Sequence, residues 1–228
     1  MWHEIAFAFG AYILGSFPLM YLMGRLHGVD LRQYEDMHIA TWRHVGRLQG
    51  FIGVVFDFAK GVIAVVIARE VLHFSSGWVA VAGVSAVVGQ MWPVFLKFDG
   101  ERGNSTGLAM SGALATYAML IALVPVAIGF GVRTVPRFLQ KDQTMNEKLK
   151  FGGPPSLSLP LGMAIAFAVL PLAAWLVGEP LGVILALVAM FVLILVRRLT
   201  VGLTEDLRKP SWKTGMLWNR LLFDRSEI

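Results

Sequence analysis

The sequence predicts an all-α membrane protein, a polytopic helical bundle of about seven transmembrane helices that forms a single domain over residues 1–228. Two features of composition favour this fold class: 56% of the 228 residues are hydrophobic, and only 15% are charged. A soluble domain is about a quarter charged and just under half apolar, so both values depart toward a membrane protein. The third observation is a series of apolar segments that approach the roughly 20 residues needed to cross a bilayer.

Six apolar segments follow one another along the chain, and basic stretches separate most of them. The segments are residues 5–23, 51–68, 77–96, 105–132, 157–176 and 181–196. The basic stretches are residues 24–50, 97–104, 133–156 and the tail 197–228. Under the positive-inside rule these stretches are cytoplasmic, whereas the short connections at residues 70–76 and 178–180 are external. We therefore expect a multi-pass protein of the cell (plasma) membrane, with its amino terminus outside and its site facing the cytoplasm.

Segment 105–132 poses a parity problem, because basic stretches flank it on both sides. A single crossing would place one of those stretches outside, so we expect two short helices with a turn near residues 117–125. One long tilted helix in a six-helix protein is the alternative. We favour seven helices.

Several classes of protein are disfavoured by simple counts. The absence of cysteine excludes a disulfide framework and a cysteine metal site. The net charge of +5 comes from basic residues beside membrane segments, where the positive-inside rule explains them without nucleic acid. His27, His38 and His44 share one loop but lack the spacing of a metal motif, so we expect no metal and no cofactor. The amino terminus lacks the positive stretch of a signal peptide, and the first helix is expected to be retained.

The stretch from Gly89 to Gly107 is the most informative part of the sequence. A helix is expected to end there, and a turn bracketed by Gly100 and Gly103 leads into the next helix. Backbone amides exposed by the two glycines, beside a helix amino terminus and Arg102, suit a phosphate group. The alternative is an ordinary turn before a capped helix.

Two further groups of polar residues accompany this stretch. The loop after the first helix is rich in groups suited to an anionic ligand, namely Arg32, His38, Arg43, His44 and Arg47. Its alternative role is attraction to anionic lipid headgroups. Asp57 and Lys60 place two charges on one face of an apolar segment, where they could serve a site or neutralise each other.

Three motifs occur in order along the chain. They are Gly15-Ser16-x-Pro18 with Gly28-Val29-Asp30-Leu31-Arg32, then Asp57-x-x-Lys60-Gly61, then Gly89-x-x-x-Pro93-Val94-Phe95-Leu96-Lys97-Phe98-x-Gly100-x-x-Gly103 with Thr106-Gly107. In this set the chain resembles the bacterial acyl-phosphate:glycerol-3-phosphate acyltransferase family, and the resemblance covers most of its length. The resemblance implies seven helices, a cytoplasmic active site, and acyl transfer from an acyl phosphate to the sn-1 hydroxyl of glycerol 3-phosphate. The product would be lysophosphatidic acid, made in phospholipid biosynthesis.

The chain differs from the family pattern at several motif positions. Where the family has Gly-Gly-Lys-Gly, this chain has Gly100-Glu101-Arg102-Gly103, and where the family has Gly-His, it has Gly89-Gln90. The family's Ser-Gly-Asn-x-Gly-Ala-Thr-Asn corresponds to residues 36–43, which differ from it. The last family motif is retained only as Arg198-Leu199-x-x-Gly202 with Glu205. Carried onto these positions, the resemblance makes Arg102 catalytic. We expect His38 to be a substitute catalytic acid or base, because its ordinary pKa lies near 6.5 and it occupies a motif position; the alternative is that it caps a helix. The resemblance also guides the assignment of the remaining site residues. It assigns substrate or phosphate binding to Asp36, Arg43, Arg47, Gln90, Gly100, Gly103, Ser105, Thr106 and Arg198. It assigns support of the site to Ser16, Asp57 and Lys60.

The expected partners are therefore an acyl phosphate, glycerol 3-phosphate or a related polar acceptor, and the lipid bilayer. A relative that has lost catalysis, and instead binds lipid phosphate or an active acyltransferase, is a second hypothesis. A small transporter is a third, disfavoured because no internal repeat is apparent. The sequence leaves the oligomeric state open.

Overall fold

The computed structural model describes residues 1–34, 36–139, 148, 156–208 and 213–225, and its regular elements are all helical. The longer helices are α1 (Trp2–Ser16), α2 (Leu19–Leu26), α4 (Arg47–Val66), α5 (Ser76–Met91), α6 (Asn104–Leu114), α7 (Thr116–Leu139), α9 (Ser158–Leu176), α10 (Leu181–Thr200) and α12 (Gly215–Phe223). The short elements are η1 (Leu31–Gln33), α3 (Met37–Ala40), η2 (Thr41–Val45), η3 (Ile67–Val71), η4 (Val94–Leu96) and α11 (Leu203–Asp206).

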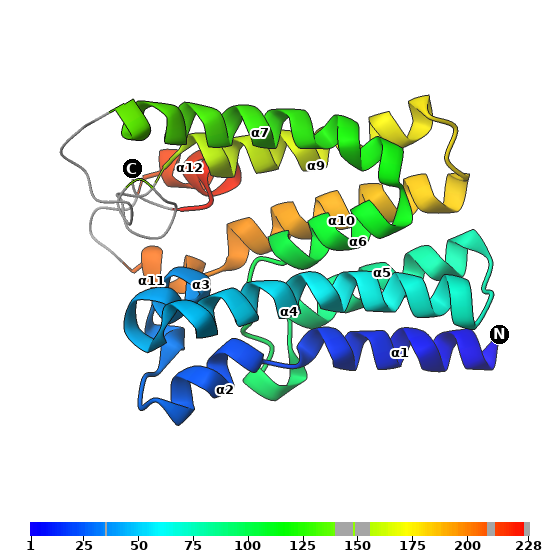
Figure 1. Cartoon of the computed structure of the whole chain (residues 1–228), viewed down its shortest axis with the longest axis horizontal. Coiled ribbons are helices and arrows are strands. Elements are labelled where there is room, and N and C mark those ends of the chain that lie inside the picture. Colours follow the sequence, from blue (N-terminus) through cyan, green and yellow to red (C-terminus); the bar gives the residue numbers. More distant parts are fainter. Residues whose placement is uncertain (35, 140–147, 149–155, 209–212, 226–228) are drawn as a thin grey trace.

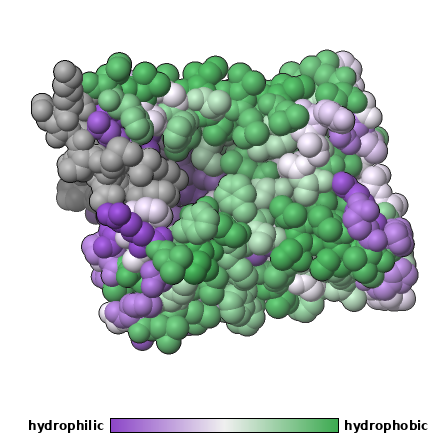
Figure 2. Space-filling model, in the orientation of Figure 1, coloured by the Kyte–Doolittle hydropathy of each residue, from purple (hydrophilic) through white to green (hydrophobic). Residues whose placement is uncertain are grey.

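Six helical segments of the described chain are long and apolar enough to cross a membrane, judged by length and composition. They are Trp2–Leu26, Arg47–Val71, Ser76–Leu96, Thr116–Leu139, Ser158–Leu176 and Leu181–Asp206. Apolar side chains cover the middle of the molecule, and hydrophilic side chains gather toward its two ends (Figure 2). This pattern confirms the predicted all-α membrane bundle.

The apolar segment 105–132 is divided into two helices, as the parity argument predicted. The division lies at Ala115, so the predicted turn near residues 117–125 was misplaced. Pro125 sits inside helix α7 instead of ending it. Helix α6 has only 11 residues, which is about 16 Å and roughly half of the hydrocarbon thickness, and so it is not among the six spans.

Proline sets the ends of two helices that lead to the site. Phe17, which precedes Pro18, is extended and separates α1 from α2. Trp92, which precedes Pro93, leaves the helical region and ends α5. In both places the proline ring disfavours a helical conformation of the preceding residue.

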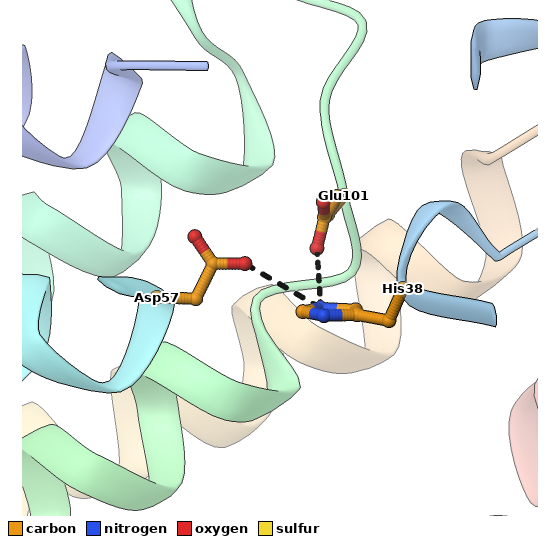
Figure 3. Close-up of side chains that lie close together, drawn as sticks. All are labelled: His38, Asp57 and Glu101. Atoms are coloured by element: carbon orange, nitrogen blue, oxygen red, sulfur yellow. Dashed lines mark ion pairs between the residues drawn. The ribbon is translucent and has the colours of Figure 1, made fainter. Parts of the chain in front are cut away.

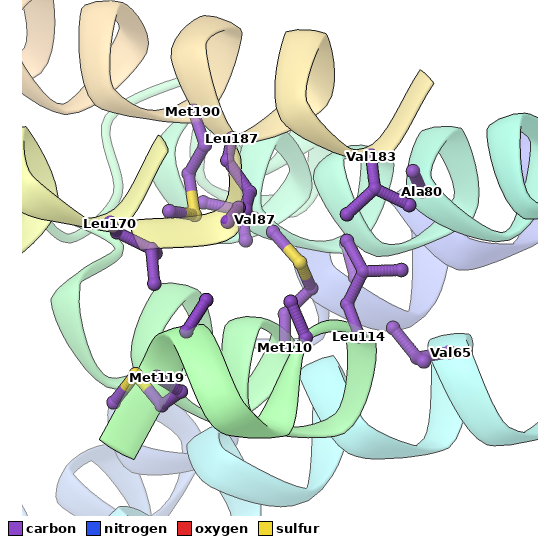
Figure 4. Close-up of a cluster of buried hydrophobic side chains, with 14 of the residues drawn as sticks. Val65, Ala80, Val87, Met110, Leu114, Met119, Leu170, Val183, Leu187 and Met190 are labelled. Carbon is purple, nitrogen blue, oxygen red and sulfur yellow. The ribbon is translucent and has the colours of Figure 1, made fainter. Parts of the chain in front are cut away.

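Close approach between helices depends on small residues. A Cβ atom at Gly15 would lie 2.0 Å from the backbone oxygen of Ala86, and one at Gly89 would lie 2.1 Å from that of Tyr12. Helices α1 and α5 therefore touch through their backbones. Behind this contact, buried side chains such as Val65, Met110, Leu187 and Met190 join α4, α6 and α10 in one core (Figure 4).

The polar segments collect at one end of the bundle. Figure 1 shows α2, α3, α11 and α12 at the end opposite the amino terminus. The stretch predicted as a loop at residues 24–50 is largely folded, as the end of α2 followed by η1, α3, η2 and the start of α4. Helix α7 continues through the predicted loop start to Leu139; residues 140–147 and 149–155 of that loop, and 209–212 and 226–228 of the tail, lie outside the described residues.

Candidate active site

A cleft of about 380 Å³ opens at this polar end of the bundle. It is lined by the connection between α5 and α6, by η1 and α3, by the end of α10, and by α11 and α12. Elements from both halves of the sequence therefore contribute to one polar site.

The connection between α5 and α6 requires its glycines. Gly103 has a positive φ of 73°, which side-chain-bearing residues rarely adopt, and it immediately precedes α6. A Cβ atom at Gly100 would lie 2.3 Å from the backbone oxygen of Gln90. Arg197 holds the connection from α10, because its guanidinium donates to the backbone oxygens of Gly100 and Glu101 and pairs with Asp99.

His38 lies between two carboxylates. Its Nε2 atom is 3.0 Å from Glu101 Oε2 and 3.4 Å from Asp57 Oδ2 (Figure 3). Each carboxylate has a second partner: Lys60 Nζ lies 2.9 Å from Asp57 Oδ1, and Gln90 Nε2 donates to Glu101 Oε2 over 3.2 Å. The carboxylate of Glu101 is therefore turned toward the imidazole and the amide.

These contacts set the pKa values of His38 and Glu101, both of which lie outside the membrane-spanning segments. Burial alone would lower the pKa of His38, but the charge and hydrogen bond of Glu101, with help from Asp57 and Asp36, raise it to about 9. Burial would raise the pKa of Glu101, but the charge and hydrogen bond of His38, with Lys60, lower it below its usual value. The pair thus favours an imidazolium beside a carboxylate in the resting site.

The two ring nitrogens of His38, Nε2 and Nδ1, have different surroundings. Because Nε2 faces the two carboxylates, it carries the proton that they accept. Nδ1 is buried and has no hydrogen-bond partner among the described residues. His38 is also part of the cleft lining.

Arg102 and Arg198 meet the tail on another wall of the cleft. Arg102 Nε lies 2.7 Å from Asp224 Oδ1, and its Nη2 donates to the backbone oxygen of Asp224 over 3.2 Å. Arg198 Nε lies 4.0 Å from the same carboxylate oxygen, while its Nη1 donates to the backbone oxygen of Leu221. Burial outweighs the two arginines and raises the pKa of Asp224 above its usual value.

The structure brings half of the predicted site residues to this cleft. Its lining includes Asp36, His38, Gly100, Arg102, Gly103, Ser105 and Arg198. Asp36 also caps α3, since its Oδ1 accepts from the backbone N–H of Ile39 over 3.0 Å. Ser16, Asp57, Lys60 and Gln90 lie together along a second, smaller hollow behind Glu101.

Three predicted binding residues lie elsewhere. Arg43 and Arg47 are exposed and do not line the cleft. Thr106 is fully buried, and its hydroxyl donates over 2.8 Å to the backbone oxygen of Asp57, which ties α6 to α4. Their assignment to binding stays a prediction.

Other residues of the site were not among the predicted ones. Arg197 has a signal in the sequence, since it sits beside Arg198 at the end of an apolar segment, where charges usually serve a site or pair. Asp99 and Asp224 have no such signal in the sequence, because acidic residues are common in loops and tails and do not by themselves indicate a site. Arg220 and Asp206 form an ion pair in the cleft lining, and residue spacing in the sequence gives no sign of it either.

The cluster of His38, Asp57 and Glu101 could in principle hold a metal ion. Its nitrogen and oxygen ligand atoms all lie within 4.8 Å of one another. A protonated His38 and Lys60 already balance the charge of the two carboxylates, however. An ion would have to displace the His38 proton.

Comparison with known proteins decides the family. A profile described as glycerol-3-phosphate acyltransferase matches residues 5–202. The chain belongs to this family. The glycerol-3-phosphate acyltransferase of Geotalea daltonii is 36% identical over 126 residues, which cover 54% of this chain and 64% of that protein. Glycerol-3-phosphate acyltransferase 4 of Dehalococcoides mccartyi is 39% identical over 121 residues, covering 51% of this chain and 65% of that one. The matches thus span somewhat less than two thirds of these relatives.

Solved structures of the glycerol-3-phosphate acyltransferase family share the fold. Crystal structures of PlsY (YgiH), an integral membrane glycerol 3-phosphate acyltransferase, superpose with TM-scores of 0.69 for the glycerol 3-phosphate form and 0.67 for the lysophosphatidic acid form. Sequence identity is 22% and 23%, over 95% of this chain and 98% of those chains. The predicted membership and fold class are confirmed.

Proposed function

We propose that this chain transfers an acyl group from an acyl phosphate to the primary hydroxyl of glycerol 3-phosphate, releasing inorganic phosphate and lysophosphatidic acid. The observation that carries the proposal is the position of His38 in the cleft. Its Nε2 is engaged by two carboxylates and its Nδ1 lacks a partner among the described residues. Family membership over residues 5–202 supplies the reaction class.

The chemistry needs little beyond alignment, a proton acceptor and stabilisation of phosphate, because an acyl phosphate is already activated. The hydroxyl oxygen of the acceptor attacks the carbonyl carbon, and the bond from that carbon to the phosphate oxygen breaks. The neutral form of His38, which keeps its proton on Nε2 and becomes populated as the pH approaches its raised pKa of about 9, takes the hydroxyl proton on Nδ1. It later gives this proton up to the released phosphate or to water. Glu101 and Asp57 stabilise the imidazolium that forms, in the manner of a carboxylate behind a catalytic histidine.

Phosphate binding falls to the arginines of the cleft. Arg102 and Arg198 both line it, and their guanidinium groups suit bidentate contacts with phosphate oxygens. The backbone of the connection around Gly100 and Gly103, next to the amino terminus of α6, adds N–H donors.

The site is proposed to face the cytoplasm of the plasma membrane. Support comes from the four basic stretches, whose described residues include the end of α2, α3 and α11 at one end of the bundle. Soluble glycerol 3-phosphate could then enter from water, while an acyl chain stays in the bilayer beside the apolar faces of the spans.

A catalytically silent relative that binds lipid phosphate is the second candidate. It is favoured by the ion pair between Asp224 and Arg102, which occupies a guanidinium that the reaction would use. The two candidates predict opposite results in a turnover assay.

The test uses the purified, detergent-solubilised chain with palmitoyl phosphate and glycerol 3-phosphate. Wild type should form lysophosphatidic acid, and Arg102→Ala should lower kcat/KM by about tenfold or more, since a charge-assisted contact is lost. The matched control is Arg25→Ala, an exposed arginine of α2 outside the cleft, which should behave as wild type. No product with glycerol 3-phosphate refutes the proposal; turnover with another polar acceptor would then mark an altered acceptor, and no turnover with any acceptor a silent relative.

A further inference from the structure

The Asp224 carboxylate occupies a position that would suit an anionic ligand. Around it are Arg102 Nε at 2.7 Å, Asn104 Nδ2 at 3.4 Å and Arg198 Nε at 4.0 Å. Two guanidinium groups and an amide converging on two oxygens is the donor set expected around a phosphate.

The backbone directs Asp224 into this position. Asp224 ends helix α12 with a positive φ of 60°, in the left-handed region, and its N–H donates to the backbone oxygen of Arg220. Aspartate tolerates this conformation better than most residues. The turn brings the side chain back toward the cleft, where its exposure is only 12%.

A second set of contacts holds α12 against the bundle. Arg220 pairs with Asp206 and donates to the backbone oxygen of Val201, while Arg198 donates to that of Leu221. These contacts are polar and buried, and Arg198, Val201, Asp206 and Arg220 all line the cleft. These polar contacts, together with the buried side chain of Met216, hold α12 beside the cleft.

The tail that supplies Asp224 lies outside the part of the chain matched by the family profile, which ends at residue 202. Asp224 is therefore not accounted for by the residues that define the family match. It places a negative charge on the cations that the proposed function assigns to phosphate.

We propose that Asp224 occupies the site of a substrate phosphate group. Its contacts with Arg102 and Arg198 must then break, and helix α12 must move away, before a phosphate monoester binds. The inference rests on the proposed function for the identity of the ligand. The phosphate could belong to glycerol 3-phosphate or to the acyl phosphate. In both cases the tail raises the apparent Kd, because only the fraction of molecules with an open site can bind.

Calorimetric titration of the detergent-solubilised full chain tests the competition without requiring turnover. The two probes are glycerol 3-phosphate and hexadecyl phosphate, an unreactive alkyl phosphate. Asp224→Asn should bind at least one of them about tenfold more tightly than wild type, and the probe that gains identifies the source of the phosphate. The control Glu70→Gln removes an exposed carboxylate outside the cleft, and it should bind as wild type does. Equal or weaker binding of both probes by Asp224→Asn, or no binding by any variant, overturns the inference.

A second measurement leaves Asp224 in place, in case its substitution harms folding. The chain has no cysteine, so Trp218→Cys on α12 gives a single site for a spin label, and that position is 64% exposed. Saturating the protein with the probe should increase the mobility of the label as α12 leaves the cleft. An unchanged spectrum while calorimetry records binding contradicts the inference. Because neither measurement depends on catalysis, failure of the tail competition and failure of acyl transfer are told apart.

Discussion

The Nε2 atom of His38 lies 3.0 Å from the Oε2 atom of Glu101, and this pair joins α3 to the connection between α5 and α6. Both residues replace others in the family motifs: the pattern has asparagine and glycine where this chain has His38 and Glu101. The two substitutions therefore form a contact with each other, and the Glu101 carboxylate has the His38 imidazole as its partner.

Removing the carboxylate of Glu101 should change the pH dependence of the reaction. With Glu101 in place the pKa of His38 is raised to about 9, so kcat/KM should increase with pH up to that region as the imidazole becomes neutral. Glu101→Gln removes the charge and should move the midpoint down by about one pH unit or more. Glu70→Gln, at an exposed position away from the cleft, serves as the control. An unchanged midpoint in Glu101→Gln would mean that the pair is only structural.

The same pair should make stability depend on pH. His38 has a folded pKa of about 9 against 6.5 unfolded, so its stabilisation is complete below pH 6.5 and is lost as the pH rises to about 9. The lowered pKa of Glu101 acts in the other direction, since its stabilisation is present above about pH 4.5. The melting temperature in detergent should therefore fall between pH 6.5 and 9.

His38→Gln supplies the check on that slope. The variant should flatten the fall above pH 6.5, while His27→Gln, an exposed histidine at the end of α2, should keep it. A slope retained in His38→Gln would assign the pH dependence to another group.

The backbone contact between α1 and α5 predicts opposite effects for two glycines of one helix. Gly15→Ala places a Cβ atom 2.0 Å from the backbone oxygen of Ala86 and should destabilise the protein by about 1 to 3 kcal/mol. Gly10→Ala meets nothing within 4 Å and should be neutral or gain up to about 1 kcal/mol from helix propensity. Thermal unfolding followed by circular dichroism in detergent compares them, and equal melting temperatures would contradict the packing.

Arg69 should stabilise the break between α6 and α7. Its guanidinium donates to the backbone oxygens of Ala113 and Leu114 over 2.9 and 3.0 Å, which satisfies carbonyls at the end of α6. Arg69→Ala leaves these groups without their donor and should cost about 1 to 3 kcal/mol. Arg69→Lys should recover only part of the loss, because an ammonium group cannot supply the two-pronged contact. Full recovery by lysine would argue for a purely electrostatic role.

Much of the fold follows from the sequence, because hydrophobic length and charge placement dominate in a membrane. The helix break inside segment 105–132 was predicted from charge parity, but its position was not. Ala115 carries no turn signal, whereas Pro125, which does, is accommodated inside α7. Arg69, 46 positions earlier in the chain than Ala115, donates to the carbonyls at the break, and no local sequence pattern indicates such a contact.

The site was predictable only in part, for a similar reason. Residues within the motifs, such as His38, Gly100 and Arg102, come to the cleft where the resemblance placed them. Arg43 and Arg47 do not line it, because η2 and the start of α4 leave both side chains exposed. Asp224 comes from the tail, far from every motif, and only the folded chain brings it to Arg102.

Acyl transfer with His38 as the general base is tested most directly by comparing lysophosphatidic acid formation by wild type and His38→Gln. The assay uses saturating palmitoyl phosphate and glycerol 3-phosphate near pH 9. Wild type should turn over, and kcat of His38→Gln should fall by about 100-fold or more, the contribution expected of a positioned general base. Retention of the wild-type kcat by a folded His38→Gln protein would contradict the role of His38, and absence of product from wild type would contradict acyl transfer itself.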